Sequence, residues 1–331
     1  MKRFVLTSLF AFLSLLIVFG SLVAGLFAPG RQAAGKVEIK IERGEPFSSV
    51  VRKLKEKSVI ANERIFSIWA WLNGLDKRVH WGFYRFELPL ASAAALDQMI
   101  PGRGFFYRVT VPEGLTLREA AELLEKGGVV DKERLLREAE SPGLLSELRL
   151  DESGGVEGYL FPDTYQLPRW ITEKEVLISM VEQFRAAFSA AMEEQTKTMG
   201  FTVHEVVTLA SVIEKETGTE AERPLVSAVF HNRLKLRMPL QSDPTVIYAV
   251  QGTKNITRKD LRTDHPYNTY RVKGLPPGPI CNPGLASLKA ALSPAAVPYL
   301  YFVSKNDGSH LFSVDLKEHN QAVKLYQRAG R

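Results

Sequence analysis

Two stretches of the chain resemble each other and decide the fold of the N-terminal half: IKIERGEPFSSVVRKLKEKSVIANER at residues 39–64 and VTVPEGLTLREAAELLEKGGVVDKER at residues 109–134. An offset of 70 residues aligns them without a gap and matches Gly44 with Gly114. Each copy opens with a short alternating pattern, which predicts a strand that ends at the glycine. Apolar residues at helical spacing follow and predict a helix.

A second helix is expected in each copy, because Asn62 and Asp131 are suitable N-caps. Glycine-led aromatic segments then predict a closing strand, GFYRF from Gly82 in the first copy and GYLFP from Gly158 in the second. This order of strand, helix, helix and strand resembles a LysM-like module, a small fold that grips N-acetylglucosamine polymers. For the first copy, glycan binding and scaffolding are both open. The second copy runs directly into a larger domain, which favours scaffolding.

The N-terminus predicts a membrane anchor. Lys2 and Arg3 precede an uncharged run of 27 residues, 4–30, and a helix needs roughly 20 apolar residues to cross a bilayer. A cleaved signal peptide is the alternative, but its apolar region is typically only ~7–15 residues long. Positive charges before the span favour a cytoplasmic N-terminus. We therefore expect a single-pass anchor in the inner (cytoplasmic) membrane and an extracytoplasmic body.

The expected protein is α+β, with a larger mixed α/β domain behind the anchor and the first module. The predicted boundaries are 1–30 for the stub and anchor, 37–104 for the LysM-like βααβ module, and 105–331 for the larger domain, with the second repeat in 105–165. Helical patterns predict one long helix over 173–195, another over 202–217, and a third from Pro224 to about Arg237. Residues 299–303 and 311–314 predict a hairpin, and LPPGPICNPG at 275–284 an ordered or a flexible loop.

Composition excludes several function classes. The 331 residues carry a formal charge of +6, but the basic residues are scattered, so nucleic acid is not an expected partner. Cys281 is the only cysteine, which leaves no internal disulfide and no cysteine-based metal site. Six dispersed histidines have no ligand-like spacing. We therefore expect no metal and no cofactor.

The stretch VVTLASVIEKETG at 206–218 carries the candidate chemistry. On a helical wheel Glu214 falls in line with Val203, Val207 and Ala210, away from the polar stripe of this helix. A carboxyl group on an apolar flank loses solvation when ionised, which favours its protonated form and suits it to donate a proton. Glu216 lies about as close to the stripe on its other side. The wheel leaves open which of the two carboxylates acts, and whether either does more than solvate a helix end.

Several long motifs resemble the MltG (YceG-like) endolytic murein transglycosylases, in the same order over essentially the whole chain. They are EGYLFPDTY at 157–165, LASVIEKET at 209–217, VFHNRL at 229–234, LQSDPTVIYAVQG at 240–252, YNTYRVKGLPPGPICNPG at 267–284 and PYLYFVSKNDGSHLFSVDLKEHN at 298–320. The resemblance implies that Glu214, the first glutamate of E-K-E-T, is the catalytic residue. Cys281 stands where small residues are more usual.

The resemblance implies non-hydrolytic cleavage of the bond between N-acetylmuramic acid and N-acetylglucosamine, which leaves 1,6-anhydro ends. It also implies glycan strands as substrate, association with peptidoglycan synthases, and a role in ending glycan polymerisation. Polar and aromatic side chains that could bind the sugar are Tyr159, Phe161, Glu216, Gln241, Ser242, Asp243, Thr245, Tyr248, Tyr267, Asn268, Thr269 and Tyr270. For the aromatic and S-D-P-T residues a purely structural role is equally open.

Two other functions stay open. A lysozyme-like muramidase would use Glu214 with a second carboxylate, for which Glu216, Asp163 and Asp243 are candidates. A non-catalytic anchored scaffold would bind glycan through the LysM-like units alone.

Overall fold

The structure is a computed structural model that describes Ile17, Gly20, Ala24 and Leu26 and residues 35–100, 106–150, 155–250 and 256–328. The anchor predicted for residues 1–30 lies almost wholly outside these residues. Across the described ranges, no helix combines the length and the apolar character needed to cross a membrane. Helices and three two-stranded sheets make up the fold, which confirms the mixed α+β class.

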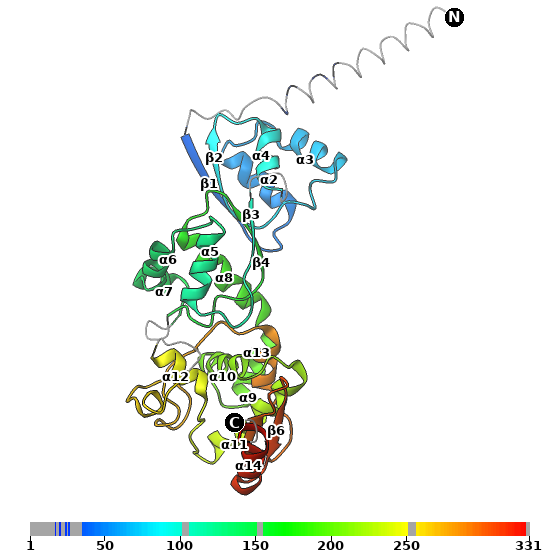
Figure 1. The fold of residues 1–331 in the computed structure, drawn as a ribbon. Helices are drawn as coiled ribbons and strands as arrows, with labels where there is room; N and C mark the ends of the chain where they lie inside the picture. Colours follow the sequence, from blue (N-terminus) through cyan, green and yellow to red (C-terminus); the bar gives the residue numbers. More distant parts are fainter. Residues whose placement is uncertain are drawn as a thin grey trace, which may run out of the picture. The chain divides into compact units, whose positions relative to one another are not determined.

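Contacts divide the chain into two compact units, Met1–Val109 with Tyr165–Glu175, and Thr110–Thr164 with Val176–Arg331. In the first unit β1 (Gly35–Ile41) pairs antiparallel with β2 (Gly82–Leu88), and α2 (Phe47–Glu56) and α3 (Glu63–Leu72) lie between them in the chain. Helix α4 (Ser92–Gln98) follows β2; α2 packs against β1 and α3, and α3 packs against α4 (Figure 1). The predicted βααβ order is therefore present, while the exact domain boundaries stay a prediction.

The core of the first unit follows the predicted periodicity. Asn62 caps α3 by accepting hydrogen bonds from the N–H groups of Arg64 and Ile65. The inward positions Leu54, Phe66 and Phe86 are fully buried. Packing of one helix face and one sheet face thus holds the unit together.

The second copy consists of β3 (Phe106–Thr110), α5 (Leu117–Lys126), α6 (Lys132–Ala139), a short α7 (Pro142–Glu147) and β4 (Thr164–Pro168), which pairs with β3. Gly44 and Gly114 both adopt positive φ, 75° and 79°, so the glycines of the two copies make the same turn. The gap-free alignment also holds through the first helices, since α2 begins at Phe47 and α5 at Leu117, and it is wrong only after them. The second helices are offset by one residue less: N-cap Asn62 corresponds to Asp131, and buried Phe66 and Ala70 correspond to buried Leu135 and Ala139.

The prediction of a closing strand at GYLFP is also wrong. Gly158 has a φ of 86°, outside the β region, and the segment forms a turn; the closing strand β4 begins at Thr164 instead. The glycine followed by aromatic residues in GYLFP is the pattern that suggests a strand. The aromatic side chains serve the core, and Tyr159 and Phe161 are both buried.

The second unit is mainly helical (Figure 1). Its further elements are α8 (Glu173–Ala187), α9 (Ala190–Thr198), α10 (Val203–Glu216), α11 (Arg223–Lys235), α12 (Asp243–Ala249), α13 (Leu285–Leu292), the hairpin of β5 (Tyr301–Ser304) and β6 (His310–Ser313), and α14 (Leu316–Val323), with single turns at Glu220–Glu222, Asp260–Arg262 and Lys324–Arg328. The single helix predicted for 173–195 is wrong. Ser189 caps α9 by accepting from the Met192 N–H, and a serine in that role begins a new helix.

Helix α10 is the centre of this unit. Thr202 and Glu205 form a capping box at its start, and every residue from Val206 to Ile213 is buried. It packs against α13, α11 and α9. The predicted helices over 202–217 and from Pro224 are confirmed to within about two residues, and so is the β5–β6 hairpin. Burial of α10 on all sides fixes the position of the residues at its C-terminal end.

The loop at 275–284 is ordered. The Ile280 N–H donates to Ser211 Oγ of α10 at 3.0 Å. The Asn282 N–H donates to the Leu115 carbonyl at 2.8 Å, and the Gly114 N–H donates to the Asn282 carbonyl at 2.9 Å. The loop is therefore tied both to α10 and to the turn of the second repeat.

Candidate active site

Glu214 lies at the buried end of α10, held by two donors. Its side chain is only 6% exposed. Oε1 accepts from Arg223 Nη2 at 3.2 Å, and Oε2 accepts from the Gly284 N–H at 3.0 Å. Both carboxylate oxygens are therefore fixed in direction while the side chain keeps a small accessible surface.

Arg223 holds a second carboxylate next to Glu214. Its Nη2 lies 3.9 Å from Glu113 Oε2, and its Nε donates to Ser287 Oγ at 3.1 Å. Burial and then the charge of Glu214 raise the pKa of Glu113, and Arg223 partly offsets this. Glu113 and Arg223 were not predicted as site residues. A signal existed, since Glu113 directly precedes the glycine of the second repeat, where the first copy has Arg43.

Glycine is required at position 284 for this arrangement. A Cβ on Gly284 would lie 1.9 Å from Glu113 Oε1 and 2.1 Å from Glu113 Cδ. The absence of a side chain lets the Glu113 carboxylate lie against the backbone that donates to Glu214. Gly114 leaves more room, because a Cβ there would be in ordinary van der Waals contact with Glu214 Cγ at 3.6 Å. The two glycine-containing turns thus shape one side of the site.

Glu216 has a different environment from Glu214. It accepts a hydrogen bond from Ser242 Oγ at 2.5 Å, so it links the end of α10 to the start of α12. Burial raises the pKa of Glu216 to about 7, with Asp243 contributing, against the lowering effect of the Ser242 hydroxyl. The two glutamates that the helical wheel could not distinguish therefore differ in their hydrogen-bond partners.

The predicted sugar-binding residues of 241–248 and 267–270 come together, but they divide into two groups. Ser242, Thr245, Asn268 and Thr269 are buried and hydrogen-bond one another or the backbone. Gln241 and Asp243 are exposed, and Tyr248, Tyr267 and Tyr270 are half-buried. The first group therefore supports the second, whose side chains reach the surface.

Two contacts orient the accessible group. The Tyr270 hydroxyl donates to Asp243 Oδ1 at 2.5 Å, and burial followed by this contact raises the pKa of Tyr270. The rings of Tyr248 and Tyr267 lie 5.0 Å apart. Aromatic faces beside hydroxyl and carboxylate groups suit the alternating apolar and polar surfaces of a sugar.

Asn282 and Glu157 organise the wall of the site. Buried Asn282 accepts from the N–H groups of Gly158 and Leu160 through Oδ1, both at 2.9 Å, and donates to Glu157 through Nδ2 at 3.2 Å. Glu157 also accepts from the Leu117 N–H at 2.9 Å. Burial raises the pKa of Glu157 to about 8, against the lowering effect of the Leu117 N–H and the Tyr248 hydroxyl. Sequence reasoning missed both residues.

Tyr159 and Phe161 lie deeper than expected. The Tyr159 hydroxyl is 3.1 Å from His204 Nδ1, its ring packs edge-on against Phe184, and Phe161 is buried. The structure gives both residues a packing role, and a sugar contact by either stays a prediction.

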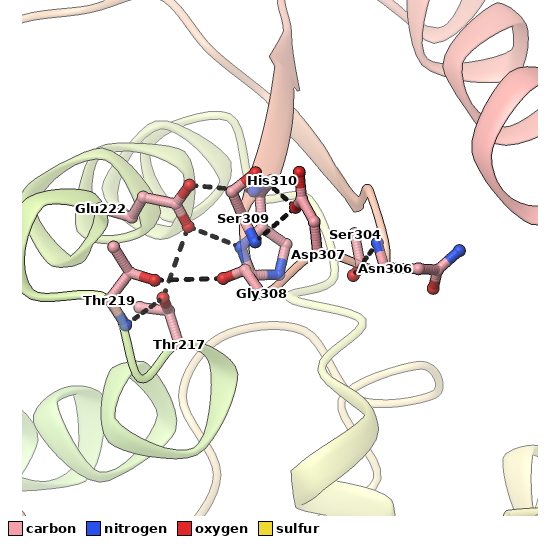
Figure 2. A network of polar contacts seen from close by, with 9 residues as sticks. All are labelled: Thr217, Thr219, Glu222, Ser304, Asn306, Asp307, Gly308, Ser309 and His310. Carbon is pink, nitrogen blue, oxygen red and sulfur yellow. Dashed lines mark hydrogen bonds and ion pairs between the residues drawn. The ribbon is translucent and has the colours of Figure 1, made fainter.

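A polar network supports the segment between Glu214 and Arg223 (Figure 2). Glu222, adjacent to Arg223, accepts from the His310 N–H at 2.9 Å and lies 2.7 Å from His310 Nδ1. Thr217, the C-cap of α10, contacts the same carboxylate, and Thr219 donates to the Gly308 carbonyl at 3.1 Å. The β5–β6 hairpin is thereby fastened to the backbone that presents Arg223.

Glu214 is the carboxylate of this site that both a cation and a backbone N–H hold. Within the described ranges, no cluster of three or more His, Cys, Asp or Glu side chains could hold a metal ion. A carboxylate aligned by a cation and a backbone N–H can exchange a proton with a bound substrate. The accessible tyrosines and Asp243 provide surfaces for a sugar polymer.

Known proteins match this chain over most of its length. The YceG-like family matches residues 39–325. A Bacillus subtilis protein named endolytic murein transglycosylase is 33% identical over 92% of this chain and 91% of its own length. One of the same name from Streptococcus pneumoniae is 29% identical over 87% of this chain and 58% of its own length. The crystal structure of a YceG-like protein from Listeria monocytogenes has a TM-score of 0.61 and 30% identity, and covers 88% of this chain and all of its own.

The fold is therefore shared with proteins described as YceG-like, and the match extends over most of the chain. The chain belongs to the YceG-like family.

Proposed function

We propose that this protein is an endolytic lytic transglycosylase that cleaves the glycan strands of peptidoglycan. The family match together with the relatives named endolytic murein transglycosylase supports this activity. The observation that carries the assignment of the site is Glu214, a nearly buried carboxylate held between Arg223 and the Gly284 N–H. Glu214 lies in the E-K-E-T motif that suggested it.

The first half of the proposed reaction is acid catalysis. Protonated Glu214 donates its proton to the glycosidic oxygen between N-acetylmuramic acid and N-acetylglucosamine. The bond from the anomeric carbon to that oxygen breaks, and the oxygen keeps the electron pair. Positive charge develops at the anomeric carbon while Glu214 becomes anionic. Arg223 and the Gly284 N–H stabilise the anionic carboxylate, so their contribution grows as the bond breaks.

The second half is base catalysis. Glu214 takes the proton of the muramoyl 6-hydroxyl, whose oxygen forms the new bond to the anomeric carbon and closes the 1,6-anhydro ring. The proton lost in the first half is thereby regained, and no water is consumed. One carboxylate suffices because the nucleophile belongs to the substrate.

The glycan is proposed to contact the accessible residues Gln241, Asp243, Tyr248, Tyr267 and Tyr270. The buried residues Ser242, Thr245, Asn268 and Thr269 hold that surface in place. Tyr159, Phe161 and Glu216 complete the predicted set, with Glu216 acting through Ser242.

The same proposal includes the location. Residues 1–30 would anchor the protein in the cytoplasmic membrane with the enzyme on its outer side, where nascent glycan emerges. An enzyme held there next to peptidoglycan synthases would end strand growth by cutting near the membrane. The length and lack of charge of residues 4–30 support this location.

One observation favours a second candidate, a muramidase. Glu113 shares Arg223 with Glu214, and a hydrolase uses a second carboxylate to activate water or attack the sugar. A muramidase would leave reducing ends in place of anhydro ends.

Product analysis separates these candidates. Purified peptidoglycan is digested with the full chain in detergent micelles, and the fragments are identified by mass spectrometry before and after borohydride reduction. The proposed reaction gives 1,6-anhydro ends that resist reduction. Reducing ends would establish the muramidase, and intact strands would favour a non-catalytic glycan-binding scaffold.

A further inference from the structure

Helix α3 presents an apolar face that the first unit leaves uncovered. Phe66 and Ala70 point into the core and are fully buried. Ile68, Trp71 and Leu72 are 48%, 68% and 67% exposed. Their spacing of three and four residues puts the three side chains on one stripe of the helix. Large apolar side chains gathered on one exposed face mark an interaction surface more often than chance.

The repeat shows that packing does not require apolar residues there. Helix α6 of the second copy buries the same two positions as α3 when the two are aligned on their N-caps. Ile68 then corresponds to Arg137, and Trp71 to Glu140, both exposed. The same position of the same supersecondary unit is thus charged in one copy and apolar in the other. The apolar stripe is a property of the first copy alone.

The start of α3 lies near the sheet end at which the chain enters the unit, because the Ala61 N–H donates to Ser92 Oγ of α4. Gly35, the first residue of β1, pairs with Leu88 at the end of β2. Helix α4 follows this strand end, and α3 packs against α4 (Figure 1). The proposed anchor ends at about Ala28, and seven residues can span at most about 25 Å. A unit of about 70 residues has a radius of gyration of about 11 Å, so the short connection keeps this end of the unit at the membrane surface.

Charge and side-chain chemistry fit a lipid surface. Residues 52–78, which include α3 and the second half of α2, contain seven Lys or Arg against three Asp or Glu. Basic residues near an anionic leaflet are attracted to it. Tryptophan prefers the boundary between headgroups and acyl chains, with aliphatic neighbours just below. Trp71, Ile68 and Leu72 thus lie in a segment of the chain with an excess of basic residues.

We propose that Ile68, Trp71 and Leu72 of α3 form a membrane-docking surface that inserts into the headgroup region of an anionic bilayer beside the anchor. This inference rests on the anchor of the proposed function. It gives the first unit a second attachment to the bilayer, so that the unit is held flat on the membrane in addition to being tethered.

The test uses the full chain reconstituted into vesicles of phosphatidylglycerol and phosphatidylethanolamine. Cys281 is fully buried, so an introduced surface cysteine can be labelled selectively. An environment-sensitive fluorophore is attached to Ile68→Cys and, as the matched control, to Arg137→Cys. Brominated lipids then report the depth of each probe. We expect at least twofold stronger quenching of the fluorophore at position 68 than at position 137. Quenching of the intrinsic tryptophan fluorescence by brominated lipid should be lost in Trp71→Phe.

Equal quenching at the two positions, with the protein resistant to alkaline extraction, would overturn docking and leave the anchor intact. The face would then belong to a protein or glycan partner. Removal of the protein by the alkaline wash would overturn the anchor and the docking together. Glycan cleavage measured in the same vesicles reports separately on the proposed enzyme activity.

Discussion

Replacing Arg223 by glutamine removes the cation that lies 3.2 Å from Glu214 and 3.9 Å from Glu113. The two carboxyl groups then face each other without compensation, and the pair holds a proton to higher pH. A hydrogen bond to a charged group contributes about 1.5–3 kcal/mol. At 1.36 kcal/mol per pH unit, the loss corresponds to a shift of about 1–2 units. The pH–rate profile of glycan cleavage by Arg223→Gln should therefore move upward by that amount.

The assay follows release of soluble glycan fragments from peptidoglycan between pH 4 and 9, with the profile normalised to its own maximum. Arg223→Lys is the matched control. It keeps a positive charge near the carboxylates but loses the bond from Arg223 Nε to Ser287 Oγ, so its profile should stay within a few tenths of a unit of the parent. Thermal unfolding of both variants shows whether each is folded at the pH of the assay.

A uniform loss of activity in Arg223→Gln, with an unmoved profile, would refute the reasoning. Arg223 would then be a packing residue, and proton exchange at Glu214 would not depend on it. An equal shift in Arg223→Lys would point to the hydrogen-bond geometry in place of the charge.

Three further predictions concern stability. Gly158→Ala should destabilise the fold by about 2–5 kcal/mol, because Gly158 has a positive φ and an added Cβ would lie 2.4 Å from Pro279. Gly155 also has a positive φ but open space around it, so Gly155→Ala should cost only about 1 kcal/mol. Urea unfolding measures both values. The raised pKa of Glu157, about 8, contributes stability that is present below its ordinary pKa and lost as pH rises through 8, so Glu157→Gln should flatten the decline of the melting temperature between pH 5 and 8. Burial alone would raise the pKa of Glu222, but the hydrogen bonds and the charge of His310 outweigh it, so the pKa is lowered. The resulting stability is present above the ordinary pKa and is lost as pH falls through the lowered value. His310→Ala should therefore remove this acid dependence of the melting temperature and lower the stability by about 1–2 kcal/mol near pH 6.

Local patterns in the sequence predicted the elements that depend on local physics. The N-caps at Asn62 and Asp131, the strand at Gly82 and the β5–β6 hairpin are fixed by short-range hydrogen bonds and by alternation of apolar residues. The prediction of a single helix over 173–195 failed because the apolar stripe continues across Ser189, and this periodicity masked the capping residue. Periodicity reports which face is buried and says nothing of a break in the backbone.

The site was predictable only in part. The helical wheel singled out Glu214 and Glu216 at the end of α10, and the resemblance of the E-K-E-T motif chose Glu214 between them. Its partners come from elsewhere: Arg223 follows the helix, Glu113 belongs to the second repeat, and Gly284 ends a proline-rich loop. Their meeting depends on long-range packing, and the close approach of Glu113 to Gly284 has no signature in either local segment.

The most direct test of the central claim compares Glu214→Gln with Glu216→Gln in peptidoglycan digestion by the full chain. Both substitutions replace a glutamate of α10 by its neutral isostere, but only Glu214 lies between Arg223 and the Gly284 N–H. Loss of an acid/base group typically costs about 10²–10⁴ in rate. We predict that Glu214→Gln, folded by circular dichroism, releases anhydro-ended fragments at least about 10²-fold more slowly, while Glu216→Gln loses less than about tenfold. Cleavage by Glu214→Gln at the rate of the unmodified protein would contradict the account.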